Sequence, residues 1–180
     1  MKLIVLDRDG VINIDSDNFI KSIDEWIPIP GSIEAIAKLS KNNYKIAVVT
    51  NQSGIARKYY DKNVLNAMHN KFRRLLADKG AKVDAIFYCP HGPKDTCTCR
   101  KPATGMYQNV EKLFGLSLKD SYTVGDSYRD LEAAMAMSSK PVLVKTGKGE
   151  KTLIDKKEEI SANQIPIYKN LANFVDNLLK

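Results

Sequence analysis

The 180-residue chain has little cysteine and no long hydrophobic run. No stretch approaches the ~18 apolar residues that a helix needs to cross a bilayer. The apolar run at residues 3–6 is too short for the core of a secretory signal peptide. We therefore expect a cytoplasmic protein with no membrane partner. In a reducing compartment its three cysteines should be free thiols or metal ligands rather than disulfides.

Basic residues outnumber acidic ones but are not clustered. The chain has 28 Lys and Arg against 21 Asp and Glu, a net charge of +7, and the excess lysines of residues 145–180 alternate with acidic residues. Nucleic-acid-binding surfaces gather basic residues to neutralise phosphates. The interleaved pattern favours an ordinary solvated surface and no nucleic-acid partner. Length and composition suit one domain over residues 1–180, and we expect a monomer.

Short β-branched runs alternate with longer segments of helical periodicity. Nearly continuous apolar runs are typical of parallel strands covered on both faces. The alternation predicts an α/β, doubly wound, mainly parallel sheet of Rossmann type, with ligands beyond the carboxyl ends of its strands. After residue 147 we expect only one more strand and a terminal helix. The predicted strands are 3–6, 46–49, 85–88, 122–124 and 142–144, and the predicted helices are 32–42, 61–79, 105–114, 128–137 and 170–179.

Polar side chains follow four of the five predicted strands. Asp7 and Asp9 come after the first strand, where two carboxylates at a turn can act as nucleophile and general acid/base. Asp126 follows the fourth strand and could complete a Mg²⁺ site with Asp7. Donors suited to an anion follow the second and third strands, namely Thr50, Asn51, Gln52 and Ser53, then Arg100 and Lys101.

Each motif alone has a simpler interpretation. Asp-x-Asp also occurs in solvated turns, and Thr50 could begin an ordinary ST-turn. Asp126 or Ser127 could be the N-cap of the following helix. Together, in this order and at these strand ends, the motifs favour a single site for phosphate chemistry.

With these motifs the chain resembles the haloacid dehalogenase superfamily of phosphohydrolases over residues 3 to about 147. Within it, the chain is similar to the heptose-bisphosphate 7-phosphatases, which share ancestry with the histidinol-phosphatases. The resemblance implies that Asp7 attacks phosphorus and becomes an aspartyl phosphate, while Asp9 is the general acid and base. It implies Mg²⁺ held by Asp7, the Asp9 backbone carbonyl and Asp126. The other implied roles are phosphoryl stabilisation by Thr50 and Lys101 and recognition of the remaining substrate by Arg100.

Too few residues separate the first two motifs for a large cap domain, so we expect a minimal cap or none. Loops should then recognise a small phosphorylated sugar, and the expected contacts are Asp15, Ser16, Asp17, Asn18, Asn51, Gln52, Ser53, Arg100 and Lys101. The resemblance implies a Mg²⁺-dependent removal of the 7-phosphate of D-glycero-D-manno-heptose 1,7-bisphosphate, on the way to lipopolysaccharide or another heptose glycan. Histidinol phosphate and other small sugar phosphates are the alternatives, and the anomer stays open.

All three cysteines and one of the two histidines lie in the stretch YCPHGPKDTCTCRKP. Cys89, His91, Cys97 and Cys99 form a Cys₃His set, which is typical of structural Zn²⁺. The resembled phosphatases carry such a loop directly before their Arg-Lys-Pro, and bound zinc would fix the residue that precedes Arg100. A redox pair of Cys97 and Cys99 is one alternative, although it lacks the C-x-x-C spacing. A zinc-dependent nucleic-acid-binding module is the other, although basic and aromatic residues around the loop are few.

Overall fold

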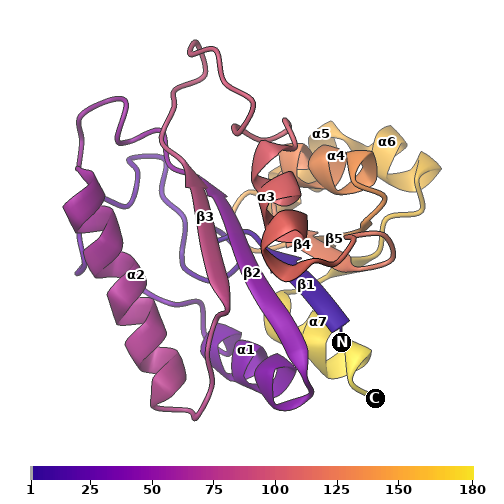
Figure 1. The fold of residues 1–180 in the computed structure, drawn as a ribbon. Helices are drawn as coiled ribbons and strands as arrows, with labels where there is room; N and C mark the ends of the chain where they lie inside the picture. Colours follow the sequence, from indigo (N-terminus) through magenta and orange to yellow (C-terminus); the bar gives the residue numbers. More distant parts are fainter. Residues whose placement is uncertain (1) are drawn as a thin grey trace.

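A single sheet of six parallel strands forms the centre of the computed structural model, which describes residues 2–180 (Figure 1). The strand order β3-β2-β1-β4-β5-β6 confirms the predicted doubly wound α/β fold. The strands are β1 (Lys2–Leu6), β2 (Tyr44–Asn51), β3 (Ala85–Cys89), β4 (Tyr122–Gly125), β5 (Lys140–Val144) and β6 (Ile167–Tyr168). The helices are α1 (Ser32–Lys41), α2 (Lys62–Ala77), α3 (Gly105–Phe114), α4 (Tyr128–Ala136), α5 (Gly149–Asp155), α6 (Lys157–Ala162) and α7 (Leu171–Leu178).

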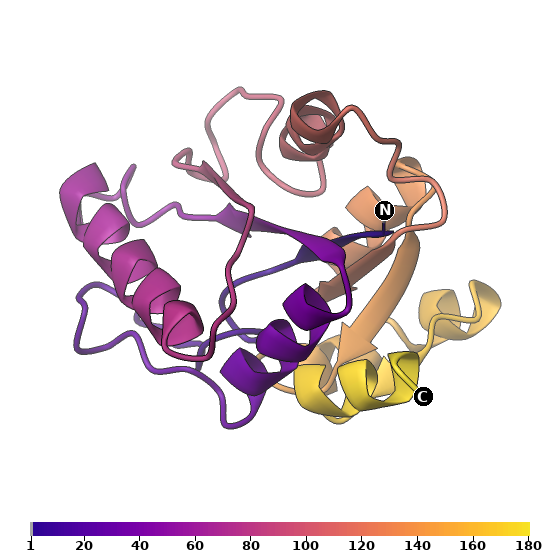
Figure 2. The ribbon, with the colours of Figure 1, turned by 60° about the horizontal axis from the view of Figure 1, so that its bottom comes forward.

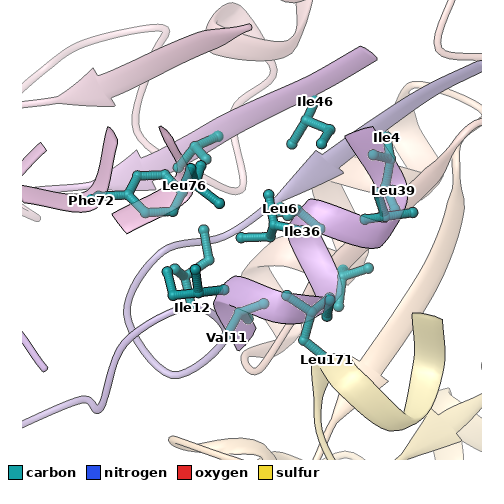
Figure 3. Close-up of a cluster of buried hydrophobic side chains, with 14 of the residues drawn as sticks. Ile4, Leu6, Val11, Ile12, Ile36, Leu39, Ile46, Phe72, Leu76 and Leu171 are labelled. Carbon is teal, nitrogen blue, oxygen red and sulfur yellow. The ribbon is translucent and has the colours of Figure 1, made fainter. Parts of the chain in front are cut away.

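Helices cover both faces of the sheet because successive strand residues point to opposite sides. Ile4 and Leu6 pack into the core under α1, α2 and α7, whereas Leu3 and Val5 pack against α3 and α4. Figure 2 shows α1 and α7 on one side of the sheet and α3 on the other. Figure 3 shows the larger core, where side chains of β1 and β2 meet those of α1, α2 and α7. Full burial of each Leu or Ile contributes about 1.5–3 kcal/mol, so this sandwich fixes the strands rigidly.

The C-terminal part differs from the prediction. The expected strand and terminal helix are present as β6 and α7, but two short helices, α5 and α6, precede them. Each of these helices buries few side chains, chiefly Thr152 in α5 and Ile160 in α6. A helix with so little buried apolar surface leaves no periodic pattern in its sequence.

The strand order reverses at β1, which pairs with β2 on one side and β4 on the other. The carboxyl ends of these three strands therefore meet at one edge of the sheet, where doubly wound folds bind their ligands. Residues 14–31 form no helix or strand of their own beyond the isolated bridge of Asn13 with Pro28, which agrees with a minimal cap. Within residues 2–180, no helix is long and apolar enough to span a bilayer.

Candidate active site

A cavity of about 230 Å³ lies beyond the carboxyl ends of β1, β2 and β4. Of the residues predicted for catalysis, Mg²⁺ and substrate, all but one line it: Asp7, Asp9, Asp15, Ser16, Asp17, Thr50, Asn51, Gln52, Ser53, Arg100, Lys101 and Asp126. Asn18 is the exception. It is exposed, and its backbone N–H donates to Ser16 Oγ at 3.1 Å.

Lys101 lies at the floor of this cavity between two carboxylates. Its Nζ is 2.8 Å from Asp7 Oδ1 and 2.7 Å from Asp130 Oδ1, and it donates to the carbonyl of Val49 at 2.8 Å. The side chain is only 3% exposed. Asp7, Asp126 and Asp130 bring their carboxylate oxygens within 4.8 Å of one another. Asp130 was not among the residues predicted for the site.

Three neighbouring carboxylates repel one another strongly in a buried place. Burial, and then the charge of Asp130, raise the pKa of Asp7 to about 7 even though Lys101 opposes the change. Burial, and then Asp7 and Asp130, raise the pKa of Asp126 well above its ordinary value. A divalent cation would relieve this repulsion, and Mg²⁺ prefers carboxylate oxygens with water and phosphate. The donor set therefore fits Mg²⁺.

Asp126 is held by hydrogen bonds and by close backbone contacts. Its Oδ2 accepts a hydrogen bond from the Lys148 backbone N–H at 2.8 Å, and its carbonyl accepts one from Thr152 Oγ1. Gly10 has a φ of +82° and lies against the carboxylate: a Cβ there would be 2.0 Å from Asp126 Oδ2. Only glycine allows this backbone conformation and this approach together.

Asp9 has different surroundings from Asp7. Its Oδ1 accepts hydrogen bonds from Arg8, at 2.8 and 3.1 Å, and from Asn13 at 2.9 Å, while its Oδ2 accepts one from Gln52 Nε2 at 2.7 Å. Burial raises the pKa of Asp9, but the Arg8 guanidinium and these hydrogen bonds outweigh it and leave the pKa lowered. Two carboxyl groups with opposite pKa shifts suit two different chemical roles.

Arg8 lies beneath the site and is 1% exposed. Besides Asp9, it contacts the ring of His69, with 3.4 Å between Nη1 and Nε2. Burial and the Arg8 charge lower the pKa of His69 to about 3, so this histidine is neutral and belongs to the support of the site.

The side chain of Asn51 is hydrogen-bonded to the backbone of Lys101, in the loop between β3 and α3. Its Oδ1 accepts from Lys101 N at 3.0 Å, and its Nδ2 donates to Lys101 O at 3.2 Å. Both amide atoms are thus used to hold Lys101, although Asn51 also lines the cavity and was predicted to contact substrate.

The four predicted zinc ligands come together beside this loop. Cys89, His91, Cys97 and Cys99 each place a ligand atom within 4.8 Å of the others. Cys99 Sγ is 3.0 Å from Cys89 Sγ and 3.2 Å from His91 Nδ1. The backbone N–H of Arg100 lowers the pKa of Cys97 to about 7, which favours the thiolate that metals bind. A closed set of three sulfurs and one nitrogen fits a structural Zn²⁺.

Comparison with known proteins agrees with this geometry. Residues 2–161 match the family described as polynucleotide kinase 3 phosphatase. The D-glycero-beta-D-manno-heptose-1,7-bisphosphate 7-phosphatase of Pseudomonas aeruginosa is 60% identical over 84% of this chain and 85% of its own, and that of Neisseria meningitidis is 46% identical over 100% and 96%. The chain belongs to the heptose-1,7-bisphosphate 7-phosphatase family. A crystal structure of the Bordetella bronchiseptica D,D-heptose 1,7-bisphosphate phosphatase, complexed with magnesium and phosphate, has a TM-score of 0.94 and 49% identity, covering 99% of this chain and 98% of that one.

This family membership confirms the expected phosphatase fold and class of enzyme. Four residues of the cavity rim were not predicted from the sequence. Arg57, Arg129 and Lys148 line the cavity, and so does Phe19, over whose ring the Arg57 guanidinium lies at 5.4 Å. Burial, then the charge of Arg129 and to a lesser degree that of Arg57, lower the pKa of Arg100, and all three arginines line the same cavity. Arg57 lies in the loop after β2 and Arg129 in the first turn of α4, and only the fold brings them to one rim.

Proposed function

We propose that this protein is a Mg²⁺-dependent phosphatase that removes the 7-phosphate of D-glycero-D-manno-heptose 1,7-bisphosphate. The observation that carries the proposal is the placement of Asp7 against Lys101 with Asp126 and Asp130 beside it, in a chain 60% identical to a protein of that name. An open cavity of about 230 Å³ suits one small sugar phosphate.

Asp7 acts as the nucleophile in this proposal. One of its carboxylate oxygens forms a bond to phosphorus while the bond from phosphorus to the sugar oxygen breaks. Asp9 gives its proton to the departing alkoxide. Water then attacks the aspartyl phosphate, Asp9 takes a proton from that water, and inorganic phosphate leaves with Asp7 restored.

The charges around Asp7 act on both steps. Its raised pKa disfavours the ionised nucleophile, and a Mg²⁺ ion bound beside it would lower that pKa. Lys101 offsets negative charge on the phosphoryl oxygens, with Thr50 as a further donor at the same strand end. Mg²⁺ held by Asp7 and Asp126, with the Asp9 carbonyl, would supply the remaining charge stabilisation. The lowered pKa of Asp9 favours the form that accepts a proton from water. A bound phosphate dianion raises the pKa of a neighbouring carboxyl and so favours the protonated form needed for the first step.

A second phosphate on the substrate agrees with the rim of the cavity. Arg57, Arg100 and Arg129 gather there, and arginine binds phosphate oxygens through paired donors. A substrate with one phosphate would leave this positive charge without a partner of opposite sign.

We also propose a structural Zn²⁺ on Cys89, His91, Cys97 and Cys99, because a closed Cys₃His set fits that ion. One zinc per chain, with thiols that react only after unfolding, is the expected result, and free reactive thiols would instead favour a redox role. The proposed setting is the cytoplasm, in the supply of heptose for lipopolysaccharide.

The decisive experiment compares kcat/KM for the α and β anomers of heptose 1,7-bisphosphate, histidinol phosphate, fructose 1,6-bisphosphate and a 3′-phosphorylated oligonucleotide. We expect a heptose bisphosphate to be preferred and Asp7→Asn to abolish its turnover. A large preference for histidinol phosphate or the oligonucleotide would overturn the substrate, and an active Asp7→Asn protein would overturn the mechanism.

A further inference from the structure

Tyr60 is connected to the proposed acid/base through a single side chain. It follows β2 in the loop that leads to α2, and it is 8% exposed. Its hydroxyl donates to Gln52 Oε1 at 2.5 Å. Gln52 Nε2 in turn donates to Asp9 Oδ2 at 2.7 Å and to Thr50 Oγ1 at 2.9 Å. A chain of hydrogen bonds thus runs from Tyr60 to two of the groups that surround the reacting phosphate.

The chemistry of these groups fixes the direction of each bond. An ionised carboxylate only accepts hydrogen bonds, so Gln52 must turn its NH₂ group toward Asp9. The amide oxygen then points the other way, into a buried place, since Gln52 is 3% exposed. A buried carbonyl oxygen needs a donor, and the Tyr60 hydroxyl supplies it. Without the Tyr60 hydroxyl, Gln52 Oε1 would lose its hydrogen bond and the amide would no longer be held in this orientation.

The two oxygens of Asp9 are held unequally. Oδ1 accepts from Arg8 and Asn13, whereas Gln52 is the one protein donor to Oδ2 within residues 2–180. Oδ2 therefore keeps an unused lone pair for the proton that Asp9 transfers, and its position depends on Gln52.

The loop is shaped to bring Tyr60 to this place. Gly54 lies under the tyrosine ring, where a Cβ would be 2.2 Å from Tyr60 Cε1. The Tyr59 backbone N–H donates to the Gly54 carbonyl at 2.9 Å and turns the chain back on itself. Burial raises the pKa of Tyr60 to about 12, so its hydroxyl keeps the proton that it donates.

We propose that Tyr60 is a positioning residue for the phosphatase reaction, acting through Gln52 to hold Asp9 Oδ2 in line with the leaving oxygen. The inference rests on the proposed phosphatase function, because it concerns the step in which Asp9 protonates the leaving group.

The test varies the leaving group in a Tyr60→Phe protein. A sugar alkoxide needs a proton to depart, whereas p-nitrophenolate is a stable anion that does not. Because kcat/KM reports steps up to the first irreversible one, it isolates transfer of phosphate to Asp7. We expect Tyr60→Phe to lower kcat/KM for heptose bisphosphate about tenfold while that for p-nitrophenyl phosphate stays within about twofold, as for a defect in general-acid catalysis. Aryl phosphate turnover also shows that the variant is folded.

Two further proteins complete the design. Tyr44→Phe is the matched control, since Tyr44 is also 8% exposed but begins β2 at the opposite end of the sheet. Gln52→Met tests the connection: if Tyr60 acts through Gln52, adding Tyr60→Phe to this background should cost nothing more. Equal losses on both substrates, no loss on the sugar phosphate, or an additional loss in the double variant would each overturn the proposal. If the wild-type enzyme hydrolysed another alkyl phosphate instead, the proposed substrate would fail, and the same comparison on that compound would still decide the role of Tyr60.

Discussion

Replacing Lys101 with methionine should destabilise the Mg²⁺-free protein in a pH-dependent way. Methionine replaces the aliphatic part of the side chain but removes the charged Nζ that lies 2.8 Å from Asp7 and 2.7 Å from Asp130. Breaking a buried ion pair typically costs about 3–5 kcal/mol, because the remaining charge is left uncompensated. Here two carboxylates lose their partner. That cost is a large share of the roughly 5–15 kcal/mol by which most domains are stable.

The pH dependence follows from the carboxylates. The pKa of Asp7 is raised to about 7 in the folded protein, so the folded state binds this proton more tightly than the unfolded state does. Protonation therefore favours the folded state as pH falls through about 7 toward the ordinary carboxyl pKa near 4. Without Lys101 the pKa must rise further. We expect most of the penalty at about pH 8 and a much smaller one at about pH 5.

Urea unfolding at both pH values measures this difference. The buffer should be free of Mg²⁺ but contain no chelator, so that metal on the cysteine cluster is not removed. Comparing each variant with wild type at the same pH cancels the opposing effect of His69, whose lowered pKa favours unfolding as pH falls below its ordinary value. Lys38→Met is the control, because Lys38 pairs with Asp176 on the surface at 54% exposure, where pairs contribute about 0–1 kcal/mol. A Lys101→Met penalty equal to that of the control, or equal at both pH values, would refute the reasoning.

Two other predictions concern the metals. Added Mg²⁺ should raise the melting temperature more at about pH 8 than at about pH 5, because the raised pKa of Asp7 makes protons compete with the ion below about pH 7. Differential scanning fluorimetry measures the two increases. Equal increases at both pH values would contradict the prediction. Cys99→Ser should lower zinc content, melting temperature and kcat/KM together while Mg²⁺ affinity, followed by calorimetry, is retained. A Cys99→Ser protein with full activity and no zinc would show that the ion does not support the site.

The position of the site could be predicted from the sequence because the strands of a parallel sheet are buried on both faces. Their continuous apolar runs are easy to find, and the polar residues directly after them must meet at one edge. Asp7 and Asp126 were found in this way, and the structure brings them together. Arg57 and Arg100 come from loops and Arg129 from the first turn of α4, and no spacing in the sequence connects the three.

Asp130 has two roles, and the sequence indicates only the one in the helix cap. Ser127 and Asp130 form a capping box at the start of α4: Asp130 Oδ2 accepts from the Ser127 backbone N–H at 3.1 Å and also from Ser127 Oγ at 2.8 Å. Ser127 is thus the N-cap, one of the two residues expected there, and a carboxylate three residues later is common in such a motif. The other carboxylate oxygen faces Lys101, a contact between residues that no sequence spacing connects. One side chain thus caps the start of α4 and pairs with the buried Lys101.

The side-chain amide of Asn51 bonds to the backbone of residue 101 as a neighbouring parallel strand would, because it provides one acceptor and one donor. The segment that carries Arg100 and Lys101 therefore has two anchors, the cysteine cluster before it and the last residue of β2 beside it. Loss of zinc would release the first anchor only. Lys101 would stay near Asp7 while Arg100 became mobile, so zinc-depleted enzyme should lose affinity for its substrate, seen as a higher KM, well before it loses kcat.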